Sequence, residues 1–534
     1  MSALVTLKQA AASIPDGALL TFGGFQLNRA PMALVFELLR QRRRGLRVVT
    51  LPNPLPLDLL VAGGAVAEAE FGFIGFQFED GFFTAPHVKG GIEAGTLSFR
   101  ERDVYEIVQG LRAAALGLPY LPAPGLEASE YMTVNRTRTI EDPATGERVP
   151  VAPAIRPDVA LVHAQMADRK GNLRIDDLYA EDLLARASGR VIATAEKIVE
   201  RLEAPTIPRL LVDAVAEAPG GAFPTSCHRS YRYSAPHLRD YLAAASRGRS
   251  GDYLRTFVEG TADHAAFLGL VENPGSWDDQ RRVPNASGAS GVITGEEGAA
   301  DRLVVEMARA ISDRDVVATG VASALPMLAI ALARFTHAPR LTYINCVGAV
   351  DPEVRAASPT SVDPRLLERC EGTITLPDMF DLARRGRIDL MFFGAAQVDA
   401  EARTNLTCIG DFARPRVKLP GPAGASSMRP FVPNVVILVP RHSPRSLPGR
   451  VDFTTTAPSP RNLATIVLTD LARLDLVGGR LRLVSRRRGT TLQDLRALTG
   501  FPLEEEGEMA RAATDEERRA LEGLDPAGLR HRMI

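Results

Sequence analysis

Short apolar runs edged by glycine, proline or aspartate recur along both halves of the chain. Apolar runs of this length between turn residues are typical of buried strands in a parallel sheet. The sequence therefore predicts strands in both halves, at Leu19–Phe22, Leu46–Leu51, Val159–His163, Val316–Ala318, Leu341–Ile344, Leu390–Phe393 and Val435–Val439.

Segments with apolar residues at helical spacing separate these strands. Pro31–Arg43 begins with proline and is followed by Gly45, an order typical of a helix start and stop. Arg100–Gly117 and Asp301–Ile311 are further predicted helices. Because strands and helices alternate, we expect an α/β fold with right-handed crossovers and doubly wound, largely parallel sheets.

Three segments of the first half recur in the same order in the second half. An ordered internal repeat indicates two related domains, and a cleft between such domains is a usual place for a site. We therefore expect two similar open α/β domains in tandem. The paired segments are Asp16–Gly24 with Asp313–Gly320, Ala164–Leu173 with Ala396–Leu406, and Ala218–Ala222 with Gly421–Ala425.

The stretch between the two halves has the composition of a linker. It contains Asn-Pro-Gly-Ser and Asn-Ala-Ser-Gly-Ala-Ser-Gly, which are typical of loops. The C-terminal tail contains two predicted helices, Thr491–Leu498 and Asp515–Leu524. We therefore divide the chain into a first domain, a linker, a second domain and a helical tail, at residues 1–271, 272–299, 300–488 and 489–534.

The composition is that of an ordinary globular protein with more than one domain. The 534 residues are 45% apolar and 24% charged, and a chain of this length exceeds a single core. A formal net charge of −1 gives no electrostatic reason to expect nucleic acid or a membrane as partner. The sequence contains no basic stretch and apolar run typical of a signal peptide, and no Cys-x-x-Cys pair. We therefore expect a reduced, cytoplasmic setting and no metal site.

Glycine and glutamine residues at predicted strand ends are candidate binding residues. Gly23, Gly24 and Phe25 follow the first strand, where glycine lets a ligand approach backbone N–H groups, and a plain tight turn is the alternative. Gln165 and Gln397 occupy matching positions of the repeat. A carboxamide there can orient a thioester or a carboxylate, unless it only caps its own loop.

Two glycine loops are further candidates for binding. The loop that contains Gly220 and Gly221 in the first half corresponds to the loop that contains Gly421 and Gly424 in the second half. Such loops can form nests of backbone N–H groups that hold an anion or an oxyanion. The alternative is a strand-to-helix crossing that needs small residues.

One cysteine and a group of acids are candidate catalytic residues. Cys346 directly follows a predicted strand, where a thiolate acts as a nucleophile if its pKa is lowered; a small buried apolar residue is the alternative. Glu101, Asp103 and Glu106 open a predicted helix, where carboxylates suit the helix dipole. The helix dipole therefore explains all three carboxylates, unless one of them faces the site.

The two halves also contain an ordered set of motifs, namely Phe22-Gly-Gly-Phe, Leu118-Pro-Tyr-Leu-Pro, Ala195-Glu-Lys-Ile-Val, Glu217-Ala-Pro-Gly-Gly-Ala, Gly394-Ala-Ala-Gln-Val-Asp and Gly421-Pro-Ala-Gly-Ala. This set resembles class I (family I) CoA-transferases with fused α and β subunits, glutaconate CoA-transferase in particular. The resemblance covers roughly residues 5–270 and 300–480. It implies two similar open α/β domains, a coenzyme A thioester as substrate and no bound cofactor.

The sequence departs from this family at one central position. The transferases use a glutamate of the β half that attacks the thioester. Counting from Ala338-Pro339 places that position at Cys346, or at Asn345 if the count slips by one. Neither side chain can form the mixed anhydride on which transfer depends. The Gly-Asn expected after the second Gln-Val-Asp is also replaced, by Ala402-Arg403.

The α half also resembles the steroid C/D-ring-opening CoA hydrolases of the same superfamily, which lack the β glutamate. The similarity is clear in Val212–Ala222 and His237–Ser246. These hydrolases use a carboxylate near the start of the helix before the Leu-Pro-aromatic-Leu-Pro motif. Counting places it at Val104, with Asp103 and Glu106 adjacent.

The resemblance implies an enzyme that acts on acyl-CoA. The first hypothesis is CoA transfer between carboxylic acids at a non-standard site, with Cys346, Glu106 and Asp103 as catalytic candidates. The alternatives are a hydrolase that cleaves a C–C bond of a cyclic β-keto acyl-CoA, and a non-catalytic acyl-CoA-binding protein. We expect acyl-CoA and a small carboxylic acid or water as partners, and a homo-oligomer. A dinucleotide enzyme is disfavoured, because no Gly-x-Gly-x-x-Gly opens a helix after the first strand.

Overall fold

The computed structural model describes residues 3–79, 81–271 and 298–534. Contacts between Cα atoms divide them into two compact units. The predicted linker lies outside the described residues except for Gly298 and Ala299. The first unit contains residues 3–76, 83–123 and 137–271, and the second contains residues 77–79, 81–82, 124–136 and 298–534.

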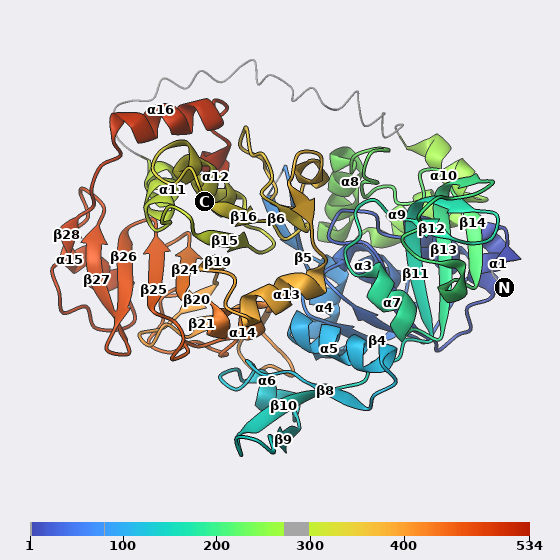
Figure 1. Cartoon of the computed structure of the whole chain (residues 1–534), viewed down its shortest axis with the longest axis horizontal. Coiled ribbons are helices and arrows are strands. Elements are labelled where there is room, and N and C mark those ends of the chain that lie inside the picture. The colour runs from blue at the N-terminus through green and yellow to red at the C-terminus, as the bar shows by residue number, and fades with distance from the viewer. Residues whose placement is uncertain (1–2, 80, 272–297) are drawn as a thin grey trace. The chain divides into compact units, whose positions relative to one another are not determined.

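The first unit is built on a sheet whose strands follow the order β1-β14-β13-β11-β2-β3-β4-β7 (Figure 1). Every neighbouring pair in this order is parallel, and β12 pairs antiparallel with β11. The strands are β1 (Ala3–Leu4), β2 (Leu19–Phe22), β3 (Leu46–Thr50), β4 (Val66–Phe71), β7 (Ser98–Glu101), β11 (Val159–Asp168), β12 (Leu173–Arg174), β13 (Arg190–Val199) and β14 (Ala214–Glu217).

The central strands of this sheet are buried because their sequences are nearly continuous apolar runs. Leu20 and Phe22 of β2 are fully buried, as are Leu161 and Val162 of β11. Helices connect these parallel strands, as crossover connections require. The helical segments are α1 (Leu7–Ala12), α2 (Met32–Arg40), α3 (Pro54–Ala62), α4 (Pro86–Ala94), α5 (Val104–Ala115), α7 (Glu181–Ala187), η1 (Arg209–Leu211), α8 (Ala235–Ser246), α9 (Ser250–Leu254), η2 (Arg255–Glu259) and α10 (His264–Leu270).

Smaller sheets are added to the main sheets. Strands β8 (Tyr120–Pro122), β10 (Arg148–Pro153) and β9 (Thr139–Glu141) form an antiparallel sheet in the first unit. Strands β5 (Gly75–Phe78) and β6 (Gly81–Thr84) form a two-stranded sheet. Antiparallel pairs are formed by β20 (Gln397–Val398) with β21 (Thr404–Asn405), and by β22 (Cys408–Ile409) with β23 (Val417–Lys418).

The second unit is built on a longer sheet with the order β18-β17-β16-β15-β19-β24-β25-β26-β27-β28 (Figure 1). Its central pairs from β16 to β25 are parallel. Antiparallel pairs extend it on both sides, to β18 and to β27, and the last strand, β28, pairs parallel with β27. The strands are β15 (Val316–Thr319), β16 (Thr342–Ile344), β17 (Ala349–Val350), β18 (Gly372–Thr373), β19 (Leu390–Gly394), β24 (Asn434–Val439), β25 (Ala464–Thr469), β26 (Ala472–Val477), β27 (Arg480–Arg486) and β28 (Glu508–Met509).

The tail contributes to the core of the second unit. Leu521 and Leu524 of α16 belong to the buried cluster formed by α11, α12 and the sheet. The helical segments of this unit are α6 (Tyr131–Val134), α11 (Ala299–Arg309), α12 (Ala324–Phe335), η4 (Pro364–Leu367), α13 (Leu376–Arg384), α14 (Ala425–Met428), η5 (Arg429–Phe431), α15 (Leu492–Leu498), α16 (Asp515–Leu524) and η6 (Leu529–Arg532).

The two open, largely parallel sheets confirm the predicted α/β class. The predicted helix Arg100–Gly117 is wrong at its start. Ser98–Glu101 forms strand β7 beside β4, and α5 begins only at Val104. The exposed residues of this edge strand gave no apolar run by which the sequence could reveal it.

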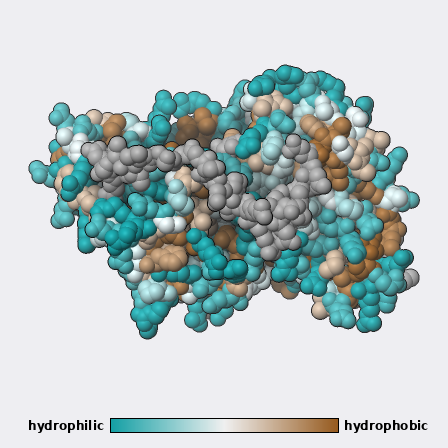
Figure 2. Space-filling view, turned by 90° about the horizontal axis from the view of Figure 1, so that it is seen from above, coloured by the Kyte–Doolittle hydropathy of each residue, from teal (hydrophilic) through white to brown (hydrophobic). Residues whose placement is uncertain are grey.

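Hydrophilic residues, in teal, cover much of the face drawn in Figure 2, with apolar patches in brown between them. A mixed surface of this kind is ordinary for a folded domain. Among the helices that the structure describes, none is both long and apolar enough to cross a membrane.

Candidate active site

Glu106 is a buried carboxyl group in the first turn of α5. Its side chain is 1% exposed. One oxygen, Oε1, pairs with the guanidinium of Arg102, and the other, Oε2, has no hydrogen-bond partner among the residues that the structure describes. Arg102 Nε also lies 2.6 Å from Oε1 of Glu70 on β4. One cation therefore lies between two carboxylates, and one carboxylate oxygen is left without a donor from the described part of the chain.

The surroundings of Glu106 make it a weaker acid than an exposed glutamate. Burial raises the pKa of Glu106, Arg102 lowers it, and the Glu70 carboxylate raises it further, with a net upward shift. Burial alone would lower the pKa of Arg102, but Glu106 and Glu70 outweigh it and raise that pKa. A carboxyl group with a raised pKa can give and take a proton nearer neutral pH.

The neighbouring acids have structural roles in this arrangement. Asp103 is the N-cap residue of α5, and its Oδ1 accepts a hydrogen bond from the Tyr105 N–H at 2.8 Å. Glu101 is the last residue of strand β7 and does not open the helix. Of the three acids that the sequence places at a helix start, only Glu106 lies inside the first turn of α5.

The Gly23-Gly24 turn lies between β2 and α2, as the sequence predicts. Gly24 has φ of +86°, and a Cβ atom there would lie 2.5 Å from the Asn28 carbonyl oxygen. Only glycine fits this position without strain. The Gly24 N–H donates to Oε1 of Glu181 at 2.7 Å. This N–H group, expected to face a ligand, is therefore bonded to a protein carboxylate.

Arg29 joins this turn to the start of α7 and the segment before it through buried ion pairs. Its guanidinium lies 2.5 Å from Oε1 of Glu181 and 2.7 Å from Oδ1 of Asp177. Burial raises the pKa of Glu181, but Arg29 and backbone N–H donors outweigh it and lower that pKa. Phe25 stacks on Tyr179, with ring centroids 4.1 Å apart. Buried ion pairs, a backbone hydrogen bond and an aromatic contact thus hold the predicted glycine turn in place.

The two repeated glutamines make equivalent contacts in the two units. Gln165 Nε2 donates to Oδ1 of Asp177 at 2.8 Å, and Gln397 Nε2 donates to Oδ2 of Asp452 at 2.7 Å. Oε1 of Gln397 accepts from the Asn405 amide at 2.8 Å. Gln165 lies within β11 and Gln397 within β20, although the sequence places both after strands. Both carboxamides hold an aspartate of their own unit.

Glu196 on β13 fixes the first glycine loop. Its Oε2 accepts the Gly220 N–H at 2.8 Å, and its Oε1 accepts the Tyr231 hydroxyl at 2.6 Å. His163 Nε2 lies 2.7 Å from the same Oε1. A Cβ atom on Gly221 would lie 2.7 Å from His163 Cε1, so glycine lets the loop lie against the imidazole. Sequence reasoning missed this role of Glu196.

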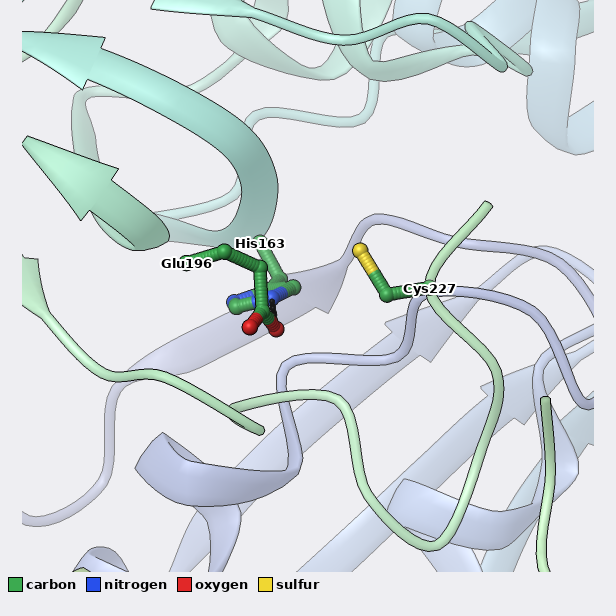
Figure 3. A group of neighbouring side chains, drawn as sticks. All are labelled: His163, Glu196 and Cys227. Atoms are coloured by element: carbon green, nitrogen blue, oxygen red, sulfur yellow. Dashed lines mark hydrogen bonds and ion pairs between the residues drawn. The ribbon is translucent and has the colours of Figure 1, made fainter. Parts of the chain in front are cut away.

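Cys227 lies beside this pair in Figure 3. Its sulfur and the ligand atoms of His163 and Glu196 lie within 4.8 Å of one another, so within the described residues these three form the group that could hold a cation. Burial, followed by the charges of Glu196 and Asp177, raises the pKa of Cys227 well above its usual value. The thiol therefore keeps its proton near neutral pH, and a hydrogen bond joins His163 to Glu196.

The second glycine loop, before α14, needs small residues. Gly421 has φ of +105°. A Cβ atom on Gly424 would lie 2.5 Å from Phe380 Cε1. The Gly421 N–H donates to the Leu406 carbonyl at 2.8 Å. The positive φ therefore explains glycine at position 421, and close packing explains glycine at position 424.

Cys346 follows β16, as predicted, and its side chain is buried. Its thiol donates to the Gly320 carbonyl oxygen at 3.2 Å. Burial raises the pKa of Cys346 to about 12. The neighbouring Asn345 is fully buried and donates to Tyr343 Oη at 2.6 Å and to the Ser361 carbonyl at 3.0 Å. The thiolate form of Cys346 is therefore scarce near neutral pH.

Known proteins match both halves of the chain. It is 30% identical over 285 residues to one of the two subunits of 3-oxoadipate CoA-transferase from Pseudomonas knackmussii, covering 51% of this chain and 99% of that subunit. It is 27% identical over 242 residues to the other subunit of this enzyme, covering 42% of this chain and 92% of that subunit. It is also 32% identical over 277 residues to the cholesterol ring-cleaving hydrolase IpdA subunit of Rhodococcus jostii, covering 48% of this chain and 93% of that subunit.

The chain spans less than two thirds of one further relative. It matches an uncharacterised protein of Archaeoglobus fulgidus at 32% identity over 281 residues, which is 51% of this chain and 62% of that protein.

Solved structures are similar to parts or nearly all of the chain. A chain of the decarboxylase AibA/AibB is 47% identical, covers 48% of this chain and 97% of its own length, and has a TM-score of 0.47. The acyl-CoA transferase YdiF from Escherichia coli O157:H7 is 15% identical, covers 95% of both chains and has a TM-score of 0.67. This last likeness shows that the fold is shared along nearly the whole chain.

The model of the Coenzyme A transferase family matches residues 4–218 and 301–495. The N-terminal half matches the first of the two transferase subunits named above, and the C-terminal half matches the second. The chain therefore belongs to the Coenzyme A transferase family, with the counterparts of both subunits fused in one polypeptide.

Proposed function

We propose that this protein is an acyl-CoA enzyme in which Glu106 moves the proton during hydrolytic cleavage of the substrate. The observation behind this proposal is the burial, the raised pKa and the hydrogen bonding of Glu106. It is a buried carboxyl group with a raised pKa, held by Arg102 at one oxygen and without a hydrogen-bond partner from the described residues at the other.

The geometry suits a carboxylate that activates water. Oε2 of Glu106 takes a proton from water while the water oxygen bonds to a carbonyl carbon of the substrate. The bond to the leaving carbon then breaks, that carbon takes the electron pair, and Glu106 returns the proton to it. The ion pair with Arg102 fixes Oε1 and leaves Oε2 for the proton.

The state of Cys346 argues against a covalent route through the second unit. A thiol with a pKa of about 12 that donates to the Gly320 carbonyl is a poor nucleophile. Asn345, the other residue at the position implied by the resemblance, is an uncharged amide bonded to Tyr343 and Ser361. Neither replaces a glutamate that forms an anhydride.

The substrate class follows from the resemblance and the relatives. We propose a cyclic β-keto acyl-CoA whose C–C bond is cleaved with the thioester retained, and water as the acceptor. The similarity to a ring-cleaving hydrolase subunit supports this class. The cytoplasmic location, the homo-oligomeric state and the absence of a bound cofactor remain predictions from the sequence.

CoA transfer between carboxylic acids is the second candidate. The matches of the two halves to the two subunits of 3-oxoadipate CoA-transferase support it. Transfer through an acyl-enzyme would place CoA on a carboxylate of the protein, and hydrolysis would not.

A binding protein without catalysis is the third candidate. It predicts that no acyl-CoA is turned over.

The experiment that separates these candidates uses oxocyclohexanecarboxyl-CoA, a cyclic β-keto thioester, in isotopically labelled water. Hydrolysis by Glu106 predicts a ring-opened CoA thioester with one labelled oxygen in its new carboxylate. The Glu106→Gln variant should lose this product, whereas Glu68→Gln, which changes an exposed glutamate on β4, should keep it.

A parallel sample receives acyl-CoA, a carboxylate acceptor and then hydroxylamine, followed by peptide mass spectrometry. An unmodified protein is expected. A hydroxamate on a protein carboxylate, with no labelled product, would support transfer in place of hydrolysis.

A further inference from the structure

A serine, a histidine and an aspartate of the first unit form a hydrogen-bonded chain. Ser250 Oγ lies 2.6 Å from His87 Nε2, and His87 Nδ1 lies 3.0 Å from Asp58 Oδ2. They come from α9, α4 and α3, respectively. A serine on one ring nitrogen and a carboxylate on the other is the arrangement of a nucleophilic triad.

The aspartate is held in place by several donors. Asp58 is fully buried. Its Oδ1 accepts the backbone N–H groups of His87 and Val88, each at 2.8 Å. Tyr241 donates its hydroxyl to Oδ2, and burial followed by the charge of Asp58 keeps the pKa of Tyr241 well above its usual value. Tyr241 is therefore a permanent donor, and the carboxylate cannot rotate away from the imidazole.

This arrangement sets the tautomer of His87. His87 Nδ1 also lies 3.0 Å from the Tyr241 hydroxyl, which donates its own proton to Asp58. Because a carboxylate only accepts hydrogen bonds, Nδ1 therefore bears the proton. Nε2 then presents its lone pair to the hydroxyl of Ser250. The His87 side chain is 20% exposed and Ser250 is half-buried, so both can be reached from solvent. The nucleophile Ser250 and its base His87 are thus accessible to solvent, whereas the Asp58 carboxylate that orients the imidazole is buried.

We propose that Ser250, His87 and Asp58 form a second reactive site, at which Ser250 accepts an acyl group from a reactive ester or thioester. Ser250 Oγ bonds to the acyl carbon while its proton passes to His87 Nε2. The bond to the leaving oxygen or sulfur breaks with its electron pair, and that atom takes the proton from Nε2. Water then cleaves the acyl-serine by the same path. This site does not depend on the function proposed for Glu106.

The test uses an alkyl fluorophosphonate on the full chain, with peptide mass spectrometry. Attack by Ser250 forms a P–O bond and releases fluoride, so one adduct is expected, on Ser250. Ser250→Ala should abolish it, and His87→Gln should slow it about 100-fold because the general base is lost. Ser246→Ala is the matched control, since Ser246 Oγ donates to the Ala243 carbonyl at the end of α8 and not to an imidazole of the described residues. This variant should label at the wild-type rate.

Asp58 is a positioning residue and needs a separate measurement. In Asp58→Asn the amide can donate to Nδ1, which turns Nε2 into a donor and slows labelling. In the His87→Gln background, Asp58→Asn should slow labelling no further, because Asp58 acts through the imidazole. No adduct on wild-type Ser250, or an adduct whose rate is unchanged in His87→Gln, would overturn the proposal.

Discussion

Arg102 binds one oxygen of Glu106 and leaves the other without a hydrogen-bond partner in the described part of the chain. Leaving a buried polar atom unpaired is costly, so its presence suggests a task such as proton transfer. The pair also sets the direction of the pKa of Glu106: burial raises it and Arg102 lowers it.

The pH dependence of turnover follows from this pair. Because water activation needs deprotonated Glu106, the rate should rise with pH through its raised pKa and level off above it. Arg102→Gln removes the group that lowers this pKa, so the acid limb should move to higher pH. Profiles of kcat/KM against pH for the wild type and the variant measure this shift. An acid limb that stays in place would show that Glu106 does not titrate in the reaction.

The thiol of Cys346 should react slowly with electrophiles and should not be needed for turnover. Its buried thiol, with a pKa of about 12, should resist iodoacetamide in the folded protein, while the half-buried Cys370 is alkylated first. Cys346→Ser should keep kcat within about twofold of the wild type, because no covalent step uses the thiol. Timed alkylation with peptide mass spectrometry and steady-state kinetics test these points. Rapid alkylation of Cys346 together with loss of turnover would favour a nucleophilic cysteine.

Gly24→Ala should destabilise the protein more than Gly64→Ala. Both glycines have positive φ, +86° and +66°, so both variants incur a backbone cost of about 1–2 kcal/mol. Only at Gly24 would the new Cβ atom meet backbone, 2.5 Å from the Asn28 oxygen, whereas Gly64 has open space. Overpacking adds about 1–3 kcal/mol at Gly24. Urea unfolding midpoints compare the stabilities of the two variants. Equal losses of stability in both would contradict the close approach of the Asn28 oxygen to position 24.

The Arg29–Glu181 pair should make stability depend on pH on the acid side. Glu181 has a lowered pKa in the folded protein, so its contribution is present above the usual value of 4.5 and is lost as pH falls through the folded pKa. Arg29→Met, which leaves a buried charge unpaired, should cost about 3–5 kcal/mol near neutral pH.

Denaturant unfolding at several pH values measures this dependence. Glu181→Gln, which has no titrating group at this position, should give a flatter stability curve below the usual glutamate pKa of 4.5 than the wild type. An identical slope in the two proteins would show that Glu181 is not coupled to folding.

The sequence predicted the buried strands well because their apolar runs are continuous. Leu19–Phe22 appears as β2 with the predicted bounds. The edge strand Ser98–Glu101 contains two exposed residues and ends in a buried glutamate, so it has no apolar run that the sequence could reveal. Strand β11 continues to Asp168, beyond its apolar run, which places Gln165 inside it.

The candidate site was less predictable because its partners come from distant segments. Glu106 was identified among three acids, but only the fold pairs it with Arg102 and Glu70. The contact between His163 and Glu196 depends on the register of β11 against β13, in which Ala164 pairs with Ala195. Spacing along the chain contains no signal for such a pair.

The central claim is most directly tested by the rate of ring opening of oxocyclohexanecarboxyl-CoA by Glu106→Gln and Glu68→Gln. An amide cannot take the proton from water, so Glu106→Gln should lower kcat by about 100-fold or more, while Glu68→Gln stays near the wild type. Equal rates in the wild type and Glu106→Gln would contradict the role assigned to Glu106.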